Sequence, residues 1–204
     1  MAGKRAESLL ELMYFIERFT LNRAWTGLTD DELFWEPAPG SWSIRPAAEC
    51  RTATPFVIGD WIADMDSELA LSADGVTKVE PMATIGWILW HVGSMPGRAA
   101  ELDFLGGART AESGWTSPYL ALHPIFTTAD EAVDVMRTGW RALGAALRSA
   151  TDEQLEEPKR FWGYGGPGPM GTGAQILAST LNEISHHGTQ IGALRDLYHF
   201  TATR

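Results

Sequence analysis

Apolar side chains recur every three to four residues in four long stretches of the chain, and this spacing predicts amphipathic helices. The first stretch runs from about Ser8 to Trp25, and the second runs from about Met82 to Leu105. The third begins after residues 127–130 and reaches Leu147, and the fourth runs from about Thr172 to Tyr198. Four helices of this length, each with one apolar face, favour an all-α four-helix bundle.

Helix-breaking and helix-capping residues refine these boundaries. Pro96 should kink the second helix, and Gly106 with Gly107 should end it. Two short helices are expected at residues 29–33 and 151–155, because each segment opens with a threonine that is followed by acidic residues.

The links between the helices are long, and they are expected to join the helices into one domain over residues 1–204. Residues 36–80 are rich in Pro, Gly, Ser and Trp, with one short helix expected near Val57–Leu71. The links at 106–127 and 156–172 are rich in Gly and Pro. No stretch alternates apolar and polar residues clearly enough to predict a strand. The prediction is therefore a single helical bundle with long crossover connections.

The fourth helix carries a carboxylate and an imidazole on the side that should face the core. Glu183 and His187 are four residues apart, which places one a turn above the other, on the side of Ile191 and Leu194. A buried carboxylate is costly unless it is paired or binds a metal, and two side chains at this spacing can chelate one ion. The alternative is that Glu183 lies at the edge of the apolar stripe and bonds an arginine or a tryptophan.

The second helix offers one further ligand. His91 shares its face with Trp87 and Met95, and a lone histidine in such a place is ordinarily a core residue with satisfied hydrogen bonds. Together, however, the two helices present two histidines and one carboxylate, namely His91, Glu183 and His187. This donor set suits a divalent ion such as Zn, Ni, Fe or Mn, with coordination positions left open for water or substrate.

Composition argues against several partners and chemistries. The chain has 16 basic and 26 acidic residues and a net charge of −10, so binding to nucleic acid or to an anionic membrane is not expected. Cys50 is the only cysteine, which rules out an internal disulfide and a multi-cysteine zinc site. No secretory signal or membrane-spanning stretch is evident in the sequence, so the expected location is the cytoplasm.

Other chemical motifs find no support. The pattern GxGxxG occurs at 163–168 and 166–171, but no strand is expected before it, so a flexible loop near the rim is predicted rather than a dinucleotide site. The chain has no GxSxG motif, and Cys50 has no neighbouring histidine to activate it. Asp60 and Asp64 share a face that is best explained by exposure to solvent.

Several residues near the predicted ligands are expected to have supporting roles. His186 points about 100° away from the neighbouring ligand, which favours an interface or supporting role over ligation. Gln190 and Arg195 lie on or near the ligand side of the helix, and a structural ion pair with a helix end is favoured for Arg195. Trp87 and Trp162 are expected to line the pocket.

Three stretches spread along most of the chain carry a family resemblance: GLTDDELFWEPAPGSWSIRP (27–46), TIGWILWHVGSM (84–95) and LNEISHHGTQIGALRDLY (181–198). They resemble, in the expected order, the DinB-like superfamily of four-helix proteins. The resemblance implies a metal held by one histidine of the second helix and two residues four apart on the last helix, which are here His91, Glu183 and His187. The superfamily usually has a histidine where this chain has Glu183. The carboxylate lowers the formal charge of the site by one and shifts its preference towards harder ions.

The resemblance also implies a function. The superfamily includes mycothiol-dependent maleylpyruvate isomerase-like proteins, so the expected activity is that of a metal-dependent thiol S-transferase or isomerase acting on a small electrophilic substrate. Because Cys50 is the only cysteine, the sulfur would come from a low-molecular-weight thiol. A homodimer that pairs through helix faces is implied as well. The alternative is a non-catalytic binding or stress-response module with a degenerate metal site.

Overall fold

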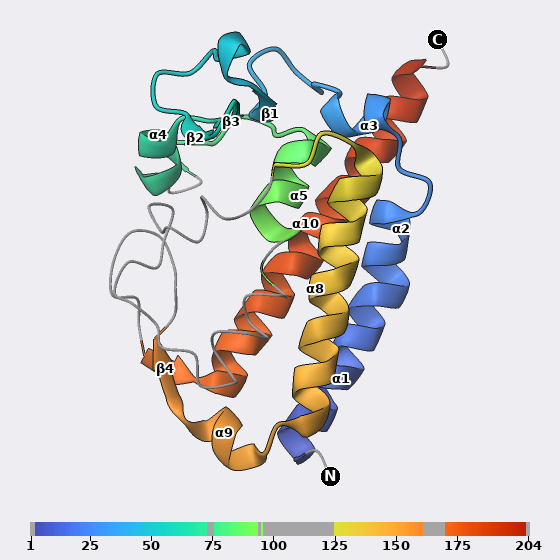
Figure 1. Cartoon of the computed structure of the whole chain (residues 1–204), viewed down its shortest axis with the longest axis vertical. Coiled ribbons are helices and arrows are strands. Elements are labelled where there is room, and N and C mark those ends of the chain that lie inside the picture. Colours follow the sequence, from blue (N-terminus) through green and yellow to red (C-terminus); the bar gives the residue numbers. More distant parts are fainter. Residues whose placement is uncertain (1–2, 73–75, 94, 96–124, 161–169, 203–204) are drawn as a thin grey trace.

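The computed structural model describes residues 3–72, 76–93, 95, 125–160 and 170–202, and most of these residues are helical (Figure 1). Three long helices, α1, α8 and α10, run side by side, and the shorter α5 packs against both α8 and α10 (Figure 1). The bounds of these helices are Lys4–Ile16 for α1, Ile85–Gly93 for α5, Ala129–Ser149 for α8 and Gly173–Ala202 for α10.

All four predicted long helices are present, with differences at their ends. The first continues beyond α1 through a π-helical turn, η1 (Glu17–Leu21), into the short helix α2 (Asn22–Trp25). The second begins at Ile85, three residues later than predicted, and is helical over α5 and at residue 95. The remainder of the predicted helix, which includes Pro96, and the predicted stop at Gly106 lie outside the described residues. Most of the glycine-rich loop motif also lies outside them, at 161–169. Within the described part of the chain, no helix combines the length and apolar character that a membrane span requires.

The two predicted short helices are confirmed as α3 (Asp30–Phe34) and α9 (Asp152–Glu156). Each begins after a threonine whose hydroxyl accepts the backbone N–H three residues later, while the side chain at that later position accepts the threonine N–H. This reciprocal capping satisfies two of the backbone donors that every helix leaves free at its first turn. The threonine-plus-acid signal in the sequence is therefore a capping signal.

The same two short helices also cap their long neighbours. The Asp30 carboxylate of α3 accepts the backbone N–H of Ala129 at the start of α8, at 2.7 Å. The Asp152 carboxylate of α9 accepts the backbone N–H groups of Lys4 and Arg5 at the start of α1, at 3.2 and 3.0 Å. Negative charge at a helix N-terminus is favourable because the helix dipole is positive there. Short segments that look like linkers in the sequence thus fix the ends of the bundle.

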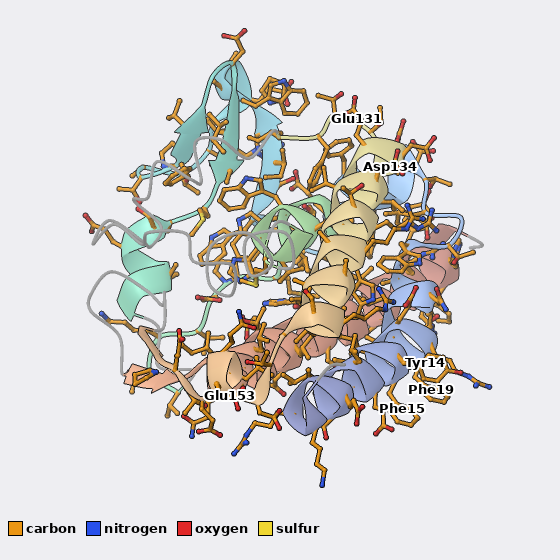
Figure 2. All side chains as sticks on the ribbon, turned by 60° about the horizontal axis from the view of Figure 1, so that its bottom comes forward. Tyr14, Phe15, Phe19, Glu131, Asp134 and Glu153 are labelled. Carbon is orange, nitrogen blue, oxygen red and sulfur yellow. The ribbon has the colours of Figure 1, made fainter. Side chains whose placement is uncertain are left out.

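Helix α1 is apolar on two sides. Leu9 and Met13 are buried against the other long helices, as the periodicity predicts. Tyr14 and Phe15, with Phe19 of η1, project outward from the opposite side (Figure 2). One apolar face of the first helix therefore belongs to the core, and a second face stays exposed in the single chain.

A small antiparallel sheet occupies part of the link between the first two long helices, in the order β1-β3-β2. The expectation of an all-α chain without strands is therefore wrong, and the fold is mostly helical with a small sheet. The helix predicted near Val57–Leu71 is wrong over its first half, where β2 and β3 form a hairpin around Gly59, whose φ is +61°. The bounds in this region are β1 Ser43–Pro46, a 3₁₀ turn η2 Ala47–Glu49, β2 Phe56–Ile58, β3 Trp61–Asp64 and α4 Ser67–Ser72. A second, two-stranded sheet pairs β4 (Pro158–Arg160) with β5 (Met170–Thr172).

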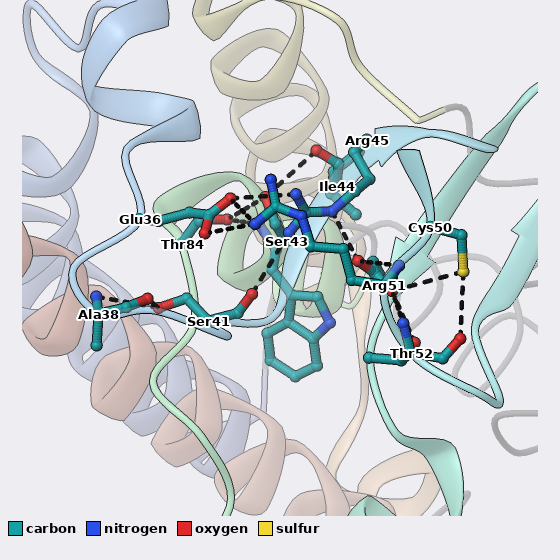
Figure 3. Close-up of polar contacts among 12 residues, drawn as sticks. Glu36, Ala38, Ser41, Ser43, Ile44, Arg45, Cys50, Arg51, Thr52 and Thr84 are labelled. Atoms are coloured by element: carbon teal, nitrogen blue, oxygen red, sulfur yellow. Dashed lines mark hydrogen bonds and ion pairs between the residues drawn. The ribbon is translucent and has the colours of Figure 1, made fainter. Parts of the chain in front are cut away.

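A buried ion-pair network holds the larger sheet together (Figure 3). Arg45 and Asp64, with side chains 6 % and 1 % exposed, pair at 2.7 Å between the Arg45 Nε and Asp64 Oδ2 atoms. Asp64 also accepts hydrogen bonds from the backbone N–H groups of Arg51 and Thr52, and Glu36 pairs with both arginines. The prediction that Asp64 faces solvent is therefore wrong, because its charge is compensated by the guanidinium of Arg45 and by backbone donors.

The chain segment that precedes α5 anchors this helix to the sheet region. Trp42 donates its backbone N–H to Met82 and accepts the backbone N–H of Thr84, at 2.9 and 2.8 Å. The hydroxyl of Thr84 then accepts the backbone N–H of Trp87 in the first turn of α5, at 3.2 Å. Since α5 carries His91, these contacts fix the position of the helix along its axis and its rotation about that axis, and with them the place of His91.

Candidate metal centre

Helix α10 holds two of the three predicted ligands on one face. Its start is capped reciprocally by Thr172 and Gln175, and it continues without interruption to Ala202. Glu183 and His187 lie one turn apart, with 3.3 Å between Glu183 Oε1 and His187 Nε2. The His187 side chain is 13 % exposed and the Glu183 side chain is 37 % exposed, so the pair lies at the border between core and solvent.

Helix α5 brings the third predicted ligand to the same place. The His91 side chain is 7 % exposed, and its Nε2 atom lies 3.5 Å from Glu183 Oε1. The two imidazole rings approach edge to face, with 5.0 Å between their centroids. One donor atom from each of the three side chains lies within 4.8 Å of the other two. Packing of α5 on α10 therefore assembles the set that the sequence suggested.

The donor set fits a divalent transition metal in type and in spacing. Two ligands of a tetrahedral zinc ion, each about 2.0–2.2 Å from the metal, lie about 3.3–3.6 Å apart. The two distances from Glu183 Oε1 to the histidine Nε2 atoms, 3.3 and 3.5 Å, lie in this range. Two neutral imidazoles and one carboxylate are also common ligands of such ions, and they leave coordination positions open.

Gln190 orients the His187 ring. The Nδ1 atom of His187 lies 3.0 Å from the side-chain oxygen Oε1 of Gln190, one turn further along α10. An amide oxygen can only accept, so the imidazole donates from Nδ1 and turns its Nε2 atom towards Glu183. Metal-bound histidines usually have a second partner of this kind, which fixes the ring orientation and raises its basicity. Gln190 therefore contacts one of the candidate ligands, and its support of a bound metal stays a prediction.

Aromatic packing fixes the second imidazole. The ring of Trp87 stacks on the ring of His91, with 5.2 Å between centroids and 12° between planes. Trp87 in turn contacts Trp42 and Trp90, and Trp90 contacts Phe56 of the sheet. Trp87 thus lies beside the candidate ligands, as expected, whereas Trp162 lies outside the described residues.

The carboxylate of the site is ionised, which suits either a metal ion or hydrogen-bonding imidazoles as its partner. Hydrogen bonds from His187 and His91 hold the pKa of the Glu183 carboxyl well below its usual range, so the group is ionised at neutral pH. Glu80, which precedes α5 in the sequence, adds a second carboxyl whose pKa responds to the charges of His187 and Glu183. Desolvation, with the negative charge of Glu183, raises the pKa of Glu80. Sequence reasoning missed Glu80, because it lies in a link with no periodic pattern.

The remaining candidates from the sequence lie outside the donor set. His186 is exposed, and its ring packs edge to face against that of His187, 5.0 Å away. Cys50 is exposed at the sheet, where its Sγ lies 3.3 Å from the backbone oxygen of Thr52 (Figure 3).

Arg195 has the structural role that was favoured for it. Its Nε lies 2.8 Å from Oε1 of the buried Glu32, and its guanidinium also donates to backbone oxygens where α2 ends, at Arg23, Thr26 and Gly27. A cation at these free carbonyls is favourable, because the dipole of a helix is negative at its C-terminus.

Comparison with known proteins gives a single result for this chain. A search of the curated proteins and a search of the solved structures each found no significant match. The model of the DinB superfamily matches residues 17–191, a range that includes α5, α8 and all three residues of the candidate metal centre. Because this match covers most of the chain, the protein belongs to the DinB superfamily.

Proposed function

We propose that His91, Glu183 and His187 bind one divalent transition metal (Zn, Ni, Fe or Mn), and that the protein is a metal-dependent thiol S-transferase or isomerase. The substrates would be a low-molecular-weight thiol and a small electrophile. The observation that carries the proposal is the convergence of three donor atoms from two helices within 4.8 Å. Membership of the DinB superfamily supports it, as do the contacts that orient both imidazoles.

The proposed architecture is a DinB-like four-helix bundle made by α1, α5, α8 and α10. Supporting contacts join α1 to α8 and α10, and join α5 to α8 and α10. In this arrangement the metal lies between α5 and α10, and the partly exposed Glu183 marks the side from which small molecules enter.

The chemistry needs both a metal and an external thiol. A bound divalent metal lowers the pKa of a thiol or water that it ligates and so supplies a nucleophile at neutral pH. The side chains of the chain hold this centre in place: Gln190 fixes the His187 ring, and Trp87 fixes the His91 ring. Cys50 is the only cysteine and contacts Thr52 and Asp64 at the sheet, so the proposal assigns the sulfur to a small molecule. The cytoplasm, where such thiols stay reduced, is the location that the proposal assumes.

One observation favours the alternative, a non-catalytic binding or stress-response module. Glu183 is within hydrogen-bonding reach of both histidines, so the three side chains can satisfy one another without a metal. In that case the cluster would be an internal polar contact at the border of the core.

Metal analysis separates the two functions. The protein is purified without added metal, and its metal content is measured for the wild type and for His91→Ala, His187→Ala and the matched control His186→Ala. We expect about one equivalent of a transition metal in the wild type and in the control, and loss of the metal in the two ligand variants with helical circular dichroism unchanged. A wild type that holds less than about a tenth of an equivalent and does not take up added metal would contradict the proposal.

The catalytic part of the proposal has its own test. The metal-loaded wild type and His187→Ala are incubated with a panel of low-molecular-weight thiols and small electrophiles. Loss of free thiol reports S-transfer, and conversion of the electrophile with the thiol regenerated reports isomerisation. We expect turnover that requires the thiol, the metal and His187. A metal-bound protein that accelerates none of these reactions supports the binding module instead.

A further inference from the structure

A buried serine of the sheet contacts the residue that directly precedes the helix of His91. Ser43 of β1 is 3 % exposed, and Thr84, directly before α5, is fully buried. Their hydroxyl oxygens lie 3.3 Å apart (Figure 3). Burying a hydroxyl costs free energy unless the group finds hydrogen-bond partners, so the surroundings of this pair decide whether it can persist in the core.

Both protons of this hydroxyl pair are used. The Thr84 hydroxyl accepts the backbone N–H of Trp87 at 3.2 Å and donates to the Ser43 hydroxyl. The Ser43 hydroxyl then donates to the backbone oxygen of Ile44 at 3.3 Å. Each hydroxyl therefore accepts once and donates once, which satisfies its single proton. The result is a continuous chain of hydrogen bonds from the backbone of β1 to the first turn of α5.

Thr84 is more than a helix cap, because of the residue that it caps. Its backbone oxygen accepts the N–H of Ile88 at 3.1 Å, and its hydroxyl accepts the N–H of Trp87, as expected of a threonine at the N-cap position. The ring of Trp87 stacks on the His91 ring with 12° between the two planes. The hydrogen bond between Thr84 and Ser43 therefore ties the ring that packs on a candidate ligand to the sheet.

The placement of α5 matters because His91 is the one donor of the three that α10 does not supply. Glu183 and His187 lie one turn apart on the same helix, so their spacing follows from helix geometry. The 3.5 Å between His91 Nε2 and Glu183 Oε1 depends instead on how α5 is rotated. A rotation of about 10° would move an atom about 6 Å from the helix axis by about 1 Å. Ligand groups have to be held within about 0.5 Å, so such a rotation would disturb the site.

We propose that Ser43 is a positioning residue of the metal centre, which fixes the rotation of α5 and the plane of the His91 ring through Thr84 and Trp87. The inference rests on the proposed metal site. The chain of contacts itself involves no metal, so its effect on His91 can be measured separately from metal binding. The small sheet then belongs to the framework that holds the site.

NMR spectroscopy of the metal-free protein tests the chain of contacts. The ring current of Trp87 shifts the proton resonances of the stacked His91 ring upfield, and comparison with His91→Ala assigns these resonances. We expect Ser43→Ala to reduce the upfield shift with helical circular dichroism unchanged, because the cap on α5 is kept and its bond to the sheet is lost.

Two variants control for the loss of a buried hydroxyl as such. Thr180→Val is the matched control, since Thr180 is also buried, at 4 % exposed, and its hydroxyl donates to Ile176 of its own helix. Thr84→Ser keeps the hydroxyl and should keep the wild-type shift of the His91 resonances. An unchanged shift in Ser43→Ala, or an equal change in Thr180→Val, would overturn the proposal.

Metal binding gives a second readout. Co²⁺ serves as the probe, because its visible absorption reports the geometry of its ligands, and its affinity is measured by competition with a chelator. We expect about three- to tenfold weaker binding in Ser43→Ala, less than the roughly 10- to 100-fold loss of a direct partner of a ligand. The Co²⁺ spectrum should change in Ser43→Ala and keep its wild-type form in Thr84→Ser. Equal affinity and an identical spectrum in Ser43→Ala would overturn this inference alone, whereas a wild type that binds no Co²⁺ would overturn the proposed function and this inference with it.

Discussion

Gly188 of α10 lies so close to Thr20 of η1 that a Cβ atom at position 188 would be 2.7 Å from the Thr20 Cγ2 atom. Gly188 directly follows the candidate ligand His187 and is buried. The π-helical turn of η1 and a residue without a side chain therefore meet beside the candidate metal centre. π-helical turns are rare and are often found near functional sites.

Gly188→Ala should therefore disturb both the packing and the site. We expect the free energy of unfolding to fall by about 1–3 kcal/mol, because the added methyl group overlaps a well-packed side chain. Metal affinity should fall as well, since α10 has to move next to His187. Chemical denaturation and a metal-competition titration measure the two effects.

Two further variants show whether the contact with Thr20 is responsible. Thr20→Ser removes the Cγ2 atom, so Gly188→Ala/Thr20→Ser should recover part of both losses. Gly192→Ala is the control, because a Cβ atom there would meet Arg23 Cδ at an ordinary 3.6 Å. If Gly188→Ala leaves the free energy of unfolding and the metal affinity unchanged, or if Gly192→Ala lowers both equally, the close approach of Gly188 to Thr20 does not support the site.

Gln190→Ala should weaken metal binding without destabilising the fold. The substitution removes the acceptor 3.0 Å from His187 Nδ1 and frees the imidazole to rotate. Loss of such a partner typically costs 10- to 100-fold in metal affinity, so a reduction of about this size is expected. Gln190→Glu should retain the affinity, since a carboxylate also accepts from Nδ1. Thr189→Ala, at the exposed neighbouring position, is the control, and a Gln190→Ala protein with unchanged affinity would contradict the role.

Local patterns in the sequence were sufficient to predict the parts of the fold that depend on neighbours along the chain. The long helices follow from the spacing of apolar residues, and the short helices follow from a threonine before acidic residues. The pair formed by Glu183 and His187 follows from the geometry of a single helix. His91 could be added because its helix also has a buried face that should meet the fourth helix, and the family resemblance implies the same three residues.

The sheet could not be predicted for a physical reason. Strands β2 and β3 are three and four residues long, too short for alternation of apolar and polar residues to be recognised. The charge of Asp64 also suggested a surface position. Its burial depends on Arg45 and on backbone donors that fold next to it, and these distant contacts leave no local signal. Glu80 could not be predicted for the same reason, because the groups that it interacts with, His187 and Glu183, are distant in the sequence.

Glu80→Gln should weaken cation binding modestly. The substitution removes one negative charge that interacts with both His187 and Glu183, without removing a member of the donor set. We expect a loss of less than about tenfold in metal affinity that grows as ionic strength is lowered, because interactions with a partly exposed charge are screened by salt. Glu153→Gln on α9 is the control. An effect of Glu80→Gln that is independent of salt would argue against an electrostatic cause.

Arg195→Met should be one of the most destabilising substitutions in the chain. It leaves the buried Glu32 carboxylate without its guanidinium partner and removes donors to the carbonyls where α2 ends. Breaking a buried ion pair on one side costs about 3–5 kcal/mol, and denaturant unfolding measures this loss. Glu32→Gln/Arg195→Met should be less destabilised than Arg195→Met, because the buried side chain that loses its guanidinium partner is then uncharged. Equal stability of the two variants would contradict this account.

The ion pair of Glu32 and Arg195 also predicts how the free energy of unfolding depends on pH. Burial alone would raise the pKa of Glu32, but hydrogen bonds from Arg195 and Thr29 lower it below its usual 4.5. The unfolded chain therefore binds this proton more readily, so the stabilising contribution is complete above about pH 4.5 and is lost as the pH falls through the folded value. Unfolding free energies across this range should fall less steeply in Glu32→Gln than in the wild type. A wild-type slope in Glu32→Gln would refute the assignment.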